Sequence, residues 1–273
     1  MLLKRVISAA VLLPVVLALF VLGGWPYALL IVGVTLLAGL EFARMFHRLG
    51  LRVSAPLLLL LILAWESGAL GESSIWPLSS ATIMVLVVSL WTLFQVSRRP
   101  DLGNASTTWA LLLAGGTYIG LGGARLISLR DGPDGLWWLL TTCFVVWIGD
   151  SAAYIVGRRI GRHKIAPTIS PGKSWEGYAA QVLSGPLSGL LLAYLSRQFP
   201  GGGVGLTSGQ GLILGIVVSV LCPAGDFLVS MMKRDVAVKD TGTLIPGHGG
   251  VLDRLDSILW AAILGEMLAT LFA

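Results

Sequence analysis

The feature that most constrains the fold is a series of long apolar runs with little polar sequence between them. Of the 273 residues, 55% are hydrophobic and only 12% are charged, whereas soluble domains carry about 25% charged residues. Because so few polar groups cannot cover a soluble surface, much of the apolar surface must face lipid. The composition therefore excludes an ordinary soluble domain and predicts an integral membrane protein in a lipid bilayer, with no nucleic-acid partner.

A helix that spans a bilayer needs roughly 20 mostly apolar residues. Nine runs meet this need, at about residues 5–23, 26–46, 54–71, 77–97, 105–126, 136–156, 176–196, 209–232 and 255–272. The third run is short and is interrupted by Glu66, so it is the weakest of the nine. We predict an all-α, polytopic membrane protein with a single transmembrane domain over residues 1–273. Its N-terminal helices occupy about 1–130, and its catalytic helices and cytoplasmic loops occupy about 136–273.

The basic residues predict the orientation of these helices. With nine spans and a cytoplasmic N-terminus, 16 of the 19 Lys and Arg residues fall on the cytoplasmic side, and only Arg125, Arg130 and Arg197 fall on the other. Cytoplasmic loops of membrane proteins carry such an excess of Lys and Arg. We therefore expect the N-terminus inside and the C-terminus outside, with two long cytoplasmic segments at about 157–175 and 233–254.

Acidic residues mark the segment from Gly225 to Ser257 as a candidate metal site. Asp226 lies inside an apolar run, where a carboxylate is costly unless it is paired, metal-bound or wetted. Asp253 and Asp256 are three residues apart at the start of the last span, which places both on one helix face. A cation would relieve their repulsion, and such oxygen ligands suit Mg²⁺.

The same segment carries features that suit phosphate binding. The glycine-rich turn Pro246-Gly247-His248-Gly249-Gly250 can bring backbone N–H groups close to phosphate oxygens. Positive charge is supplied nearby by Lys233, Arg234, Lys239 and Arg254. Together these parts suit phosphoryl or nucleotidyl transfer. The alternative is an ordinary cytoplasmic loop followed by a helix cap, but capping does not explain Asp226.

A second candidate segment runs from Gly149 to Gly177. Asp150 lies in an apolar run, and Ser170-Pro171-Gly172-Lys173-Ser174-Trp175-Glu176 is typical of a turn that enters a helix. Ser170 to Lys173 could cradle an anion, although Pro167 excludes a Walker A loop. The alternatives are a basic membrane anchor for Arg158 and its neighbours, and helix capping for Ser170 and Glu176.

Other charged residues carry weaker predictions. Glu41, Arg44, Arg48 and Arg52 cluster at the cytoplasmic end of the second span. They could attract lipid phosphate, but we expect a solvated helix end. For Glu66, within a span, we expect a hydrogen bond between helices.

The pattern Ser230-x-x-Lys233-Arg234, Lys239-Asp240 and Pro246-Gly247-His248-Gly249-Gly250-x-x-Asp253-Arg254-x-Asp256 resembles the signature of the phosphatidate cytidylyltransferases. The order and spacing match over roughly 30 residues. The stretch from Asp150 through Ser170 to Gly177 resembles a second family segment, usually SPKKTWEG. Gly172 and Ser174 depart from it, and Gly172 puts any role for a charge at that position in doubt.

The resemblance implies a homodimeric, multi-pass enzyme of the bacterial inner membrane that converts CTP and phosphatidic acid to CDP-diacylglycerol and pyrophosphate. It implies Mg²⁺ on Asp226, Asp253 and Asp256, and allows a second, monovalent cation such as K⁺. The lipid phosphate would attack the α-phosphorus of CTP in line. The implied catalytic residues are Asp226, Lys233, Arg234, Lys239, Asp240, His248, Asp253, Arg254 and Asp256. The implied substrate-binding residues are Asp150, Arg158, Ser170, Lys173, Ser174, Glu176, Gly249 and Gly250.

Two other functions fit parts of the pattern. Related membrane transferases use CTP with isoprenoid substrates, and a panel of lipid acceptors would separate these. A transporter would use Asp150 and Asp226 as coupling sites. However, the polar residues gather toward the cytoplasmic side of the spans, and no paired halves are evident. We expect the phosphatidate reaction.

Overall fold

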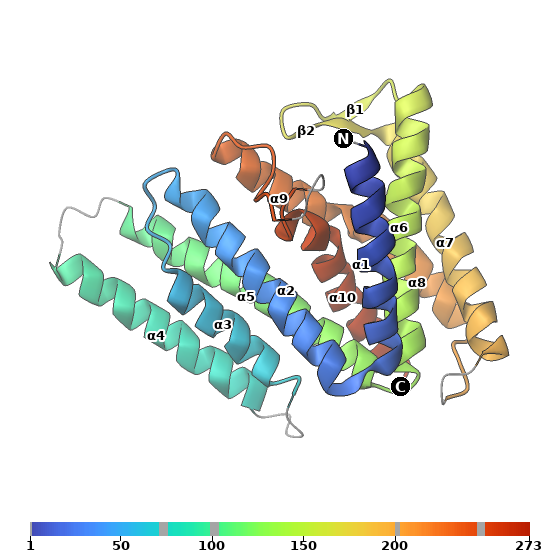
Figure 1. Ribbon diagram of the computed structural model, residues 1–273, viewed down its shortest axis with the longest axis horizontal. Coiled ribbons are helices and arrows are strands. Elements are labelled where there is room, and N and C mark those ends of the chain that lie inside the picture. The colour runs from blue at the N-terminus through green and yellow to red at the C-terminus, as the bar shows by residue number, and fades with distance from the viewer. Residues whose placement is uncertain (1, 71–75, 99–103, 200–202, 245–248) are drawn as a thin grey trace. The chain divides into compact units, whose positions relative to one another are not determined.

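The computed structural model describes residues 2–70, 76–98, 104–199, 203–244 and 249–273 (Figure 1). Within these ranges the chain forms ten helices and one two-stranded hairpin. In chain order they are α1 (Leu2–Leu22), α2 (Gly24–His47), α3 (Ala55–Ser67), α4 (Trp76–Arg98), α5 (Ala105–Asp131), α6 (Gly135–Ile160), β1 (Lys164–Ala166), β2 (Ser170–Ser174), α7 (Trp175–Gln198), α8 (Ser208–Leu221), α9 (Pro223–Asp235) and α10 (Leu252–Leu271).

Length and composition make several helices able to cross a membrane. Among the described residues, six segments meet this test: Gly24–His47, Ser80–Arg98, Ala105–Asp131, Gly135–Ile160, Trp175–Gln198 and Ser208–Asp235. Two shorter apolar helices are Ala10–Leu22 and Ala55–Ser67. The prediction of a helical, multi-pass membrane protein is therefore confirmed, whereas the count of nine spans stays a prediction.

The chain divides into two compact units. The first unit comprises Met1–Leu19, Gly24–Ile127 and Val236–Leu255, and the second comprises Phe20–Gly23, Ser128–Asp235 and Asp256–Ala273. The signature segment is thus shared, because its loop and Asp253 belong to the first unit whereas α9 and Asp256 belong to the second.

In the first unit, α3 packs against both α2 and α4. Leu61 and Ile62 of α3 are fully buried and lie against Gly116 and Gly120 of α5, where an added Cβ would collide with them. With 13 residues, α3 is shorter than the run predicted at 54–71. Its length of about 20 Å falls short of the hydrocarbon core, which is about 30 Å thick.

One buried polar contact joins two helices of this unit. Thr35 Oγ1 on α2 donates a hydrogen bond to Glu66 Oε1 on α3 over 2.7 Å, and both side chains are fully buried. The expectation that Glu66 makes a hydrogen bond between helices is confirmed.

In the second unit, α7 packs against α6 and α8 through small residues. Gly185 and Gly189 of α7 face Gly211 and Gly215 of α8, where the two backbones touch. A pair of Gly-x-x-x-Gly motifs lets membrane helices approach closely. The small residues therefore hold α7 close to α8.

The predicted helix at 209–232 is two helices. α8 ends at Leu221 and α9 begins at Pro223, because proline has no N–H to donate and clashes with the preceding turn. Asp226 consequently lies in the first turn of α9. The apolar segment Ser208–Asp235, which contains both helices, is still long enough to cross a membrane, as the sequence predicted.

The segment at 157–175, expected to be a loop, contains the hairpin of β1 and β2. The strands are antiparallel, with Lys164 opposite Ser174 and Ala166 opposite Ser170. The hairpin contacts the end of α6, the start of α7 and α9. The fold is therefore not purely helical. The hairpin places Lys173, on β2, beside α9.

Candidate active site

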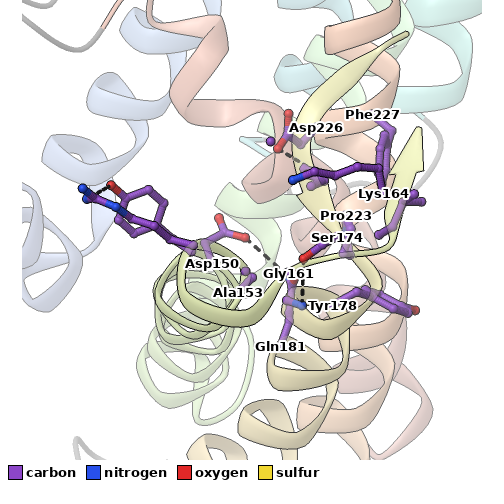
Figure 2. Close-up of a pocket in the computed structure, with 17 residues that line it drawn as sticks. Asp150, Ala153, Gly161, Lys164, Ser174, Tyr178, Gln181, Pro223, Asp226 and Phe227 are labelled. Atoms are coloured by element: carbon purple, nitrogen blue, oxygen red, sulfur yellow. Dashed lines mark hydrogen bonds and ion pairs between the residues drawn. The ribbon is translucent and has the colours of Figure 1, made fainter. Parts of the chain in front are cut away.

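A pocket of about 600 Å³ opens in the second unit (Figure 2). The residues that line it come from the C-terminal half of α6, the hairpin, the start of α7 and the start of α9. Figure 2 shows Asp150 on α6 and Asp226 on α9 as sticks at this pocket. A pocket of this size lies within the range of small-molecule sites, about 300–1,000 Å³.

Asp226 and Lys173 form an ion pair at this pocket. Lys173 Nζ lies 2.7 Å from Asp226 Oδ2 and 4.1 Å from the centre of the Phe227 ring. Ser230 Oγ donates a hydrogen bond to Asp226 Oδ1 over 3.0 Å, one helical turn further along α9. Lys173 and Ser230 therefore orient the two carboxylate oxygens of Asp226. Lys173 is one of the residues predicted to bind substrate.

Two further acids accompany Asp226 in the second unit. Asp150 accepts a 3.4 Å hydrogen bond from Gln181 Nε2, and Gln181 is itself buried. Asp256 is 8% exposed and accepts a 2.7 Å hydrogen bond from the backbone N–H of Ser257. The carboxylate of Asp256 interacts electrostatically with those of Asp226 and Asp150, and with Lys233. The site thus concentrates negative charge beside a few cations.

Basic side chains also line the pocket. Arg158 and Lys164 line it together with Lys173. The guanidinium of Arg158 lies over the Tyr154 ring and donates to the Tyr154 hydroxyl over 3.0 Å. The site therefore offers cations that can meet an anionic substrate.

The two basic residues at the end of α9 have separate environments. Lys233 is buried, whereas Arg234 is exposed and its Nε donates to the Ile169 carbonyl over 3.0 Å. Arg234 thereby ties the end of α9 to the turn of the hairpin.

Two of the predicted substrate-binding residues, Ser174 and Glu176, make contacts within the protein. Ser174 is buried and lines the pocket, but its Oγ accepts a hydrogen bond from the Gly177 N–H and so caps α7. Glu176 bonds to His163, with Glu176 Oε1 2.7 Å from Nδ1. Ser170 and Glu176 are not among the residues that line the pocket.

In the first unit, Asp253 organises the loop before α10. Its Oδ2 accepts hydrogen bonds from the Thr241 N–H (2.8 Å), the Thr241 hydroxyl (3.0 Å) and the Gly250 N–H (3.0 Å). Gly249 has a φ of +84°, in the left-handed region that glycine adopts without strain. The Asp253 carboxylate therefore joins Thr241 and Gly250 to the first turn of α10.

Glu41 belongs to the same cluster, and the sequence analysis did not identify it. Its Oε2 accepts hydrogen bonds from the Thr241 hydroxyl (3.1 Å) and the Leu252 N–H (3.0 Å). The side chain is 5% exposed, so the expectation that Glu41 lies at a solvated helix end is wrong. Its position inside an apolar run was the only available signal.

The rest of the signature lies in the first unit or outside the described residues. Lys239, Asp240 and Arg254 are exposed. His248, with Pro246 and Gly247, lies outside the described residues.

Comparison with known proteins decides the family. The sequence model of the cytidylyltransferase family matches residues 3–272. The chain belongs to this family. It is 35% identical to the phosphatidate cytidylyltransferase of Haemophilus influenzae, and the alignment covers 94% of this chain and 95% of that protein. It is 32% identical to that of Bacillus subtilis, with 99% and 98% covered. It is also 32% identical to that of Mycobacterium tuberculosis, with 87% and 73% covered.

These matches confirm the resemblance that the signature indicated. A cytidylyltransferase must bind a nucleoside triphosphate, and the cations of this pocket could hold its phosphate groups while the carboxylates could hold a metal ion. Within the described residues, no three His, Cys, Asp or Glu side chains gather closely enough to form a metal cluster. The carboxylates of Asp226 and Asp256 repel each other, and their oxygen atoms are of the kind that a hard cation prefers.

Proposed function

We propose that this cytidylyltransferase transfers CMP from CTP to phosphatidic acid and releases CDP-diacylglycerol and pyrophosphate. The observation that carries the proposal is the Asp226–Lys173 pair, which lies in a pocket of about 600 Å³ in a member of this family. The relatives named above are phosphatidate cytidylyltransferases, and the similarity to the two from Haemophilus influenzae and Bacillus subtilis covers most of each chain.

The reaction needs positioning and charge neutralisation more than proton transfer. An oxygen of the lipid phosphate bonds to the α-phosphorus of CTP, while the bond from that phosphorus to the bridging oxygen of pyrophosphate breaks. The attacking phosphate monoester is already anionic near neutral pH, so it needs no dedicated general base. Arg158, Lys164 and Lys173 would hold phosphate oxygens in the pocket.

Asp226 and Asp256, with Asp253 of the loop, would hold Mg²⁺, and a second, monovalent cation such as K⁺ is part of the proposal. When bound, Mg²⁺ supplies charge neutralisation on the phosphates. Lys173 and Ser230 orient the Asp226 carboxylate. Lys173 is therefore both a positioning group for Asp226 and a candidate contact for the substrate.

The remaining signature residues complete the proposal. We assign Lys233, Arg234, Lys239 and Arg254 to stabilising negative charge on the reacting phosphates. Gly249 and Gly250 would present backbone groups to phosphate, and Asp240 and His248 complete the loop. His248 is a candidate to protonate the leaving group.

The proposed setting is the bacterial inner membrane, crossed nine times, with the N-terminus inside and the reaction at the cytoplasmic face. A homodimer is the proposed assembly. The skew of 16 of the 19 Lys and Arg residues to one side supports the orientation. Soluble CTP would then meet the lipid where the basic segments lie.

The test is CTP-dependent conversion of phosphatidic acid by purified protein in detergent, with and without Mg²⁺. We expect CDP-diacylglycerol and pyrophosphate in equal amounts, only with the metal. Asp226→Asn should reduce turnover at least about 100-fold, because it removes a carboxylate that is proposed to hold the charge-neutralising metal. An isoprenoid phosphate as acceptor should give no product.

The matched control is Asp235→Asn, which makes the same change at the exposed end of the same helix. It should keep normal activity and the same unfolding temperature as Asp226→Asn. A folded Asp226→Asn enzyme with full activity would overturn the role of this carboxylate. Turnover of an isoprenoid phosphate in place of phosphatidic acid would overturn the proposed acceptor.

A further inference from the structure

A second pocket, of about 410 Å³, lies entirely within the first unit and shares no residue with the pocket of the candidate active site. It is formed by the end of α2, the connection to α3, the first residues of α3, and α4 near its C-terminal end. The proposed nucleotidyl transfer uses none of these residues. The pocket therefore needs a separate explanation.

Cationic side chains converge on this pocket. Arg44 and His47 lie three residues apart in the last turn of α2, so they share one helix face. Arg52 joins them from the connection between the helices. No acidic side chain among the described residues forms an ion pair with any of the three. The lining is therefore suited to an anion.

The connection that carries Arg52 has a defined shape. Leu51 and Val53 on either side of it are 8% and 2% exposed, whereas Arg52 is exposed. The Val53 N–H donates to the Leu51 carbonyl over 3.0 Å. Buried neighbours on both sides hold Arg52 outward, so its position at the pocket is built into the packing.

Polar and aromatic groups complete the lining. The side chains of Ser54 and Gln95 reach the pocket, and Ser54 makes no capping bond to α3 although it precedes that helix. Trp91 forms a wall and is 42% exposed. Hydroxyl, amide and guanidinium groups can all donate hydrogen bonds to phosphate oxygens.

The surroundings favour a lipid over a soluble phosphate. The pocket lies near the end of α4, a membrane-spanning candidate with little of its apolar surface buried. Leu86, Leu90 and Leu93 of α4 are 58%, 65% and 65% exposed. A phosphate headgroup in the pocket would leave its acyl chains along this apolar helix. Tryptophan and arginine are the residues that meet lipid at a membrane interface.

We propose that the pocket of Arg44, His47 and Arg52 binds the phosphate headgroup of an anionic phospholipid at a site distinct from the reaction site. The shared chemistry is a phosphate group held by two guanidinium groups. A free phosphate would satisfy the same cations, but only a lipid also covers the exposed face of α4.

The test measures binding of phosphatidylglycerol to the purified full chain in detergent, by native mass spectrometry across a lipid titration. Phosphatidylglycerol is anionic, but it has no phosphate monoester and so cannot act as the acceptor in the proposed reaction. Binding can therefore be scored whether or not the protein turns over CTP. We expect one saturable site for phosphatidylglycerol and none for phosphatidylcholine with the same chains.

Arg44→Gln/Arg52→Gln should weaken this binding at least about tenfold, because hydrogen bonds to charged groups are lost. Arg44→Lys/Arg52→Lys should retain most of it. The control Arg48→Gln/Arg98→Gln removes two charges from the same helix ends, outside the pocket, and should change binding less than about threefold. All variants should keep the wild-type unfolding temperature.

Two outcomes would overturn the proposal. Equal loss of binding in the pocket variant and the control would show that only general surface charge attracts the lipid. Displacement of phosphatidylglycerol by inorganic phosphate or glycerophosphate at similar concentration would show a site for soluble phosphate and not for lipid.

Discussion

Adjacent arginines at the end of α6 separate pocket chemistry from general surface charge. Arg158 lines the pocket of the candidate active site, whereas Arg159 is also exposed but does not line it. If Arg158 contacts a substrate phosphate, Arg158→Gln should raise the KM for CTP about tenfold, the value of a charge-assisted hydrogen bond. Steady-state kinetics of CDP-diacylglycerol formation at fixed ionic strength would measure the effect.

Arg159→Gln is the internal control, because it removes the same charge one residue away. Its KM should stay within about twofold of the wild type, as is usual for an exposed charge. Equal effects of the two substitutions would mean that the region attracts CTP only by its overall charge.

The Glu41 carboxylate should stabilise the loop before α10. Glu41→Ala leaves the Leu252 N–H without its acceptor, whereas the Thr241 hydroxyl keeps Asp253 as a partner. A buried unpaired N–H costs about 1–3 kcal/mol. We expect a lower unfolding temperature in detergent and faster trypsin cleavage after the exposed Lys239. Glu41→Gln, which keeps one acceptor oxygen, should show a smaller change.

An Ala variant with wild-type unfolding and proteolysis would show that the Glu41 contacts are energetically unimportant.

Glu41 also shows which part of the site could not be predicted from the sequence. Asp226, Asp253 and Asp256 stood out because a signature surrounds them, whereas Glu41 contacts residues 200 and 211 positions away. Such a contact depends on tertiary packing, which no local pattern reports.

At the scale of elements, the contact of α7 with α8 should fail when one methyl group is added. A Cβ at Gly189 would meet the Gly211 carbonyl oxygen, which is backbone and cannot move aside. Gly189→Ala should therefore destabilise the protein by about 1–3 kcal/mol, the usual cost of overpacking. The unfolding temperature in detergent measures this.

Gly33→Ala is the matched control, because Gly33 lies within α2 and an added Cβ there meets nothing within 4 Å. Its effect should be neutral or slightly stabilising, since alanine favours helix by up to about 1 kcal/mol over glycine. If both variants unfold like the wild type, close packing at Gly189 contributes little.

Most helices follow directly from apolar runs of sufficient length, but two local features did not. The break between α8 and α9 depends on Pro223, whose position inside an apolar run did not by itself distinguish a kink from a new helix. The hairpin of β1 and β2 has short strands with no alternating pattern, and it includes Pro171 and Gly172. The hairpin packs against α6 and α7. Tertiary packing of this kind leaves no local pattern in the sequence, so the strands could not be predicted.

At the scale of the whole molecule, the family and its signature were predictable because chemistry fixes residue types at fixed spacings. The division of that signature between two units was not, because Val236–Leu255 returns to the first unit after α9. A hydropathy pattern gives the lengths of segments but not their partners. The chemistry of the first-unit loop was therefore predictable from its residues, but its tertiary partners, such as Glu41, were not.

The number of crossings is the last prediction, and α3 decides it. If α3 crosses, 16 basic residues lie on one side; if it does not, every later loop changes side and the two sides carry 8 and 11. Only the first distribution fits the excess of basic residues in cytoplasmic loops. We therefore expect α3 to cross despite its 13 residues, with local thinning of the bilayer.

Reporters fused after Ala273 test this directly, because each crossing added or lost moves the C-terminus to the other side. An odd number of crossings from a cytoplasmic N-terminus predicts active alkaline phosphatase and dark green fluorescent protein at the C-terminus. Fusions after Gly50 and Gly68, which flank α3, assign the crossing to that helix. They should give a cytoplasmic and an external signal, respectively. Cytoplasmic signals from both would mean that α3 enters and leaves on one side, and the even count would then place the C-terminus inside.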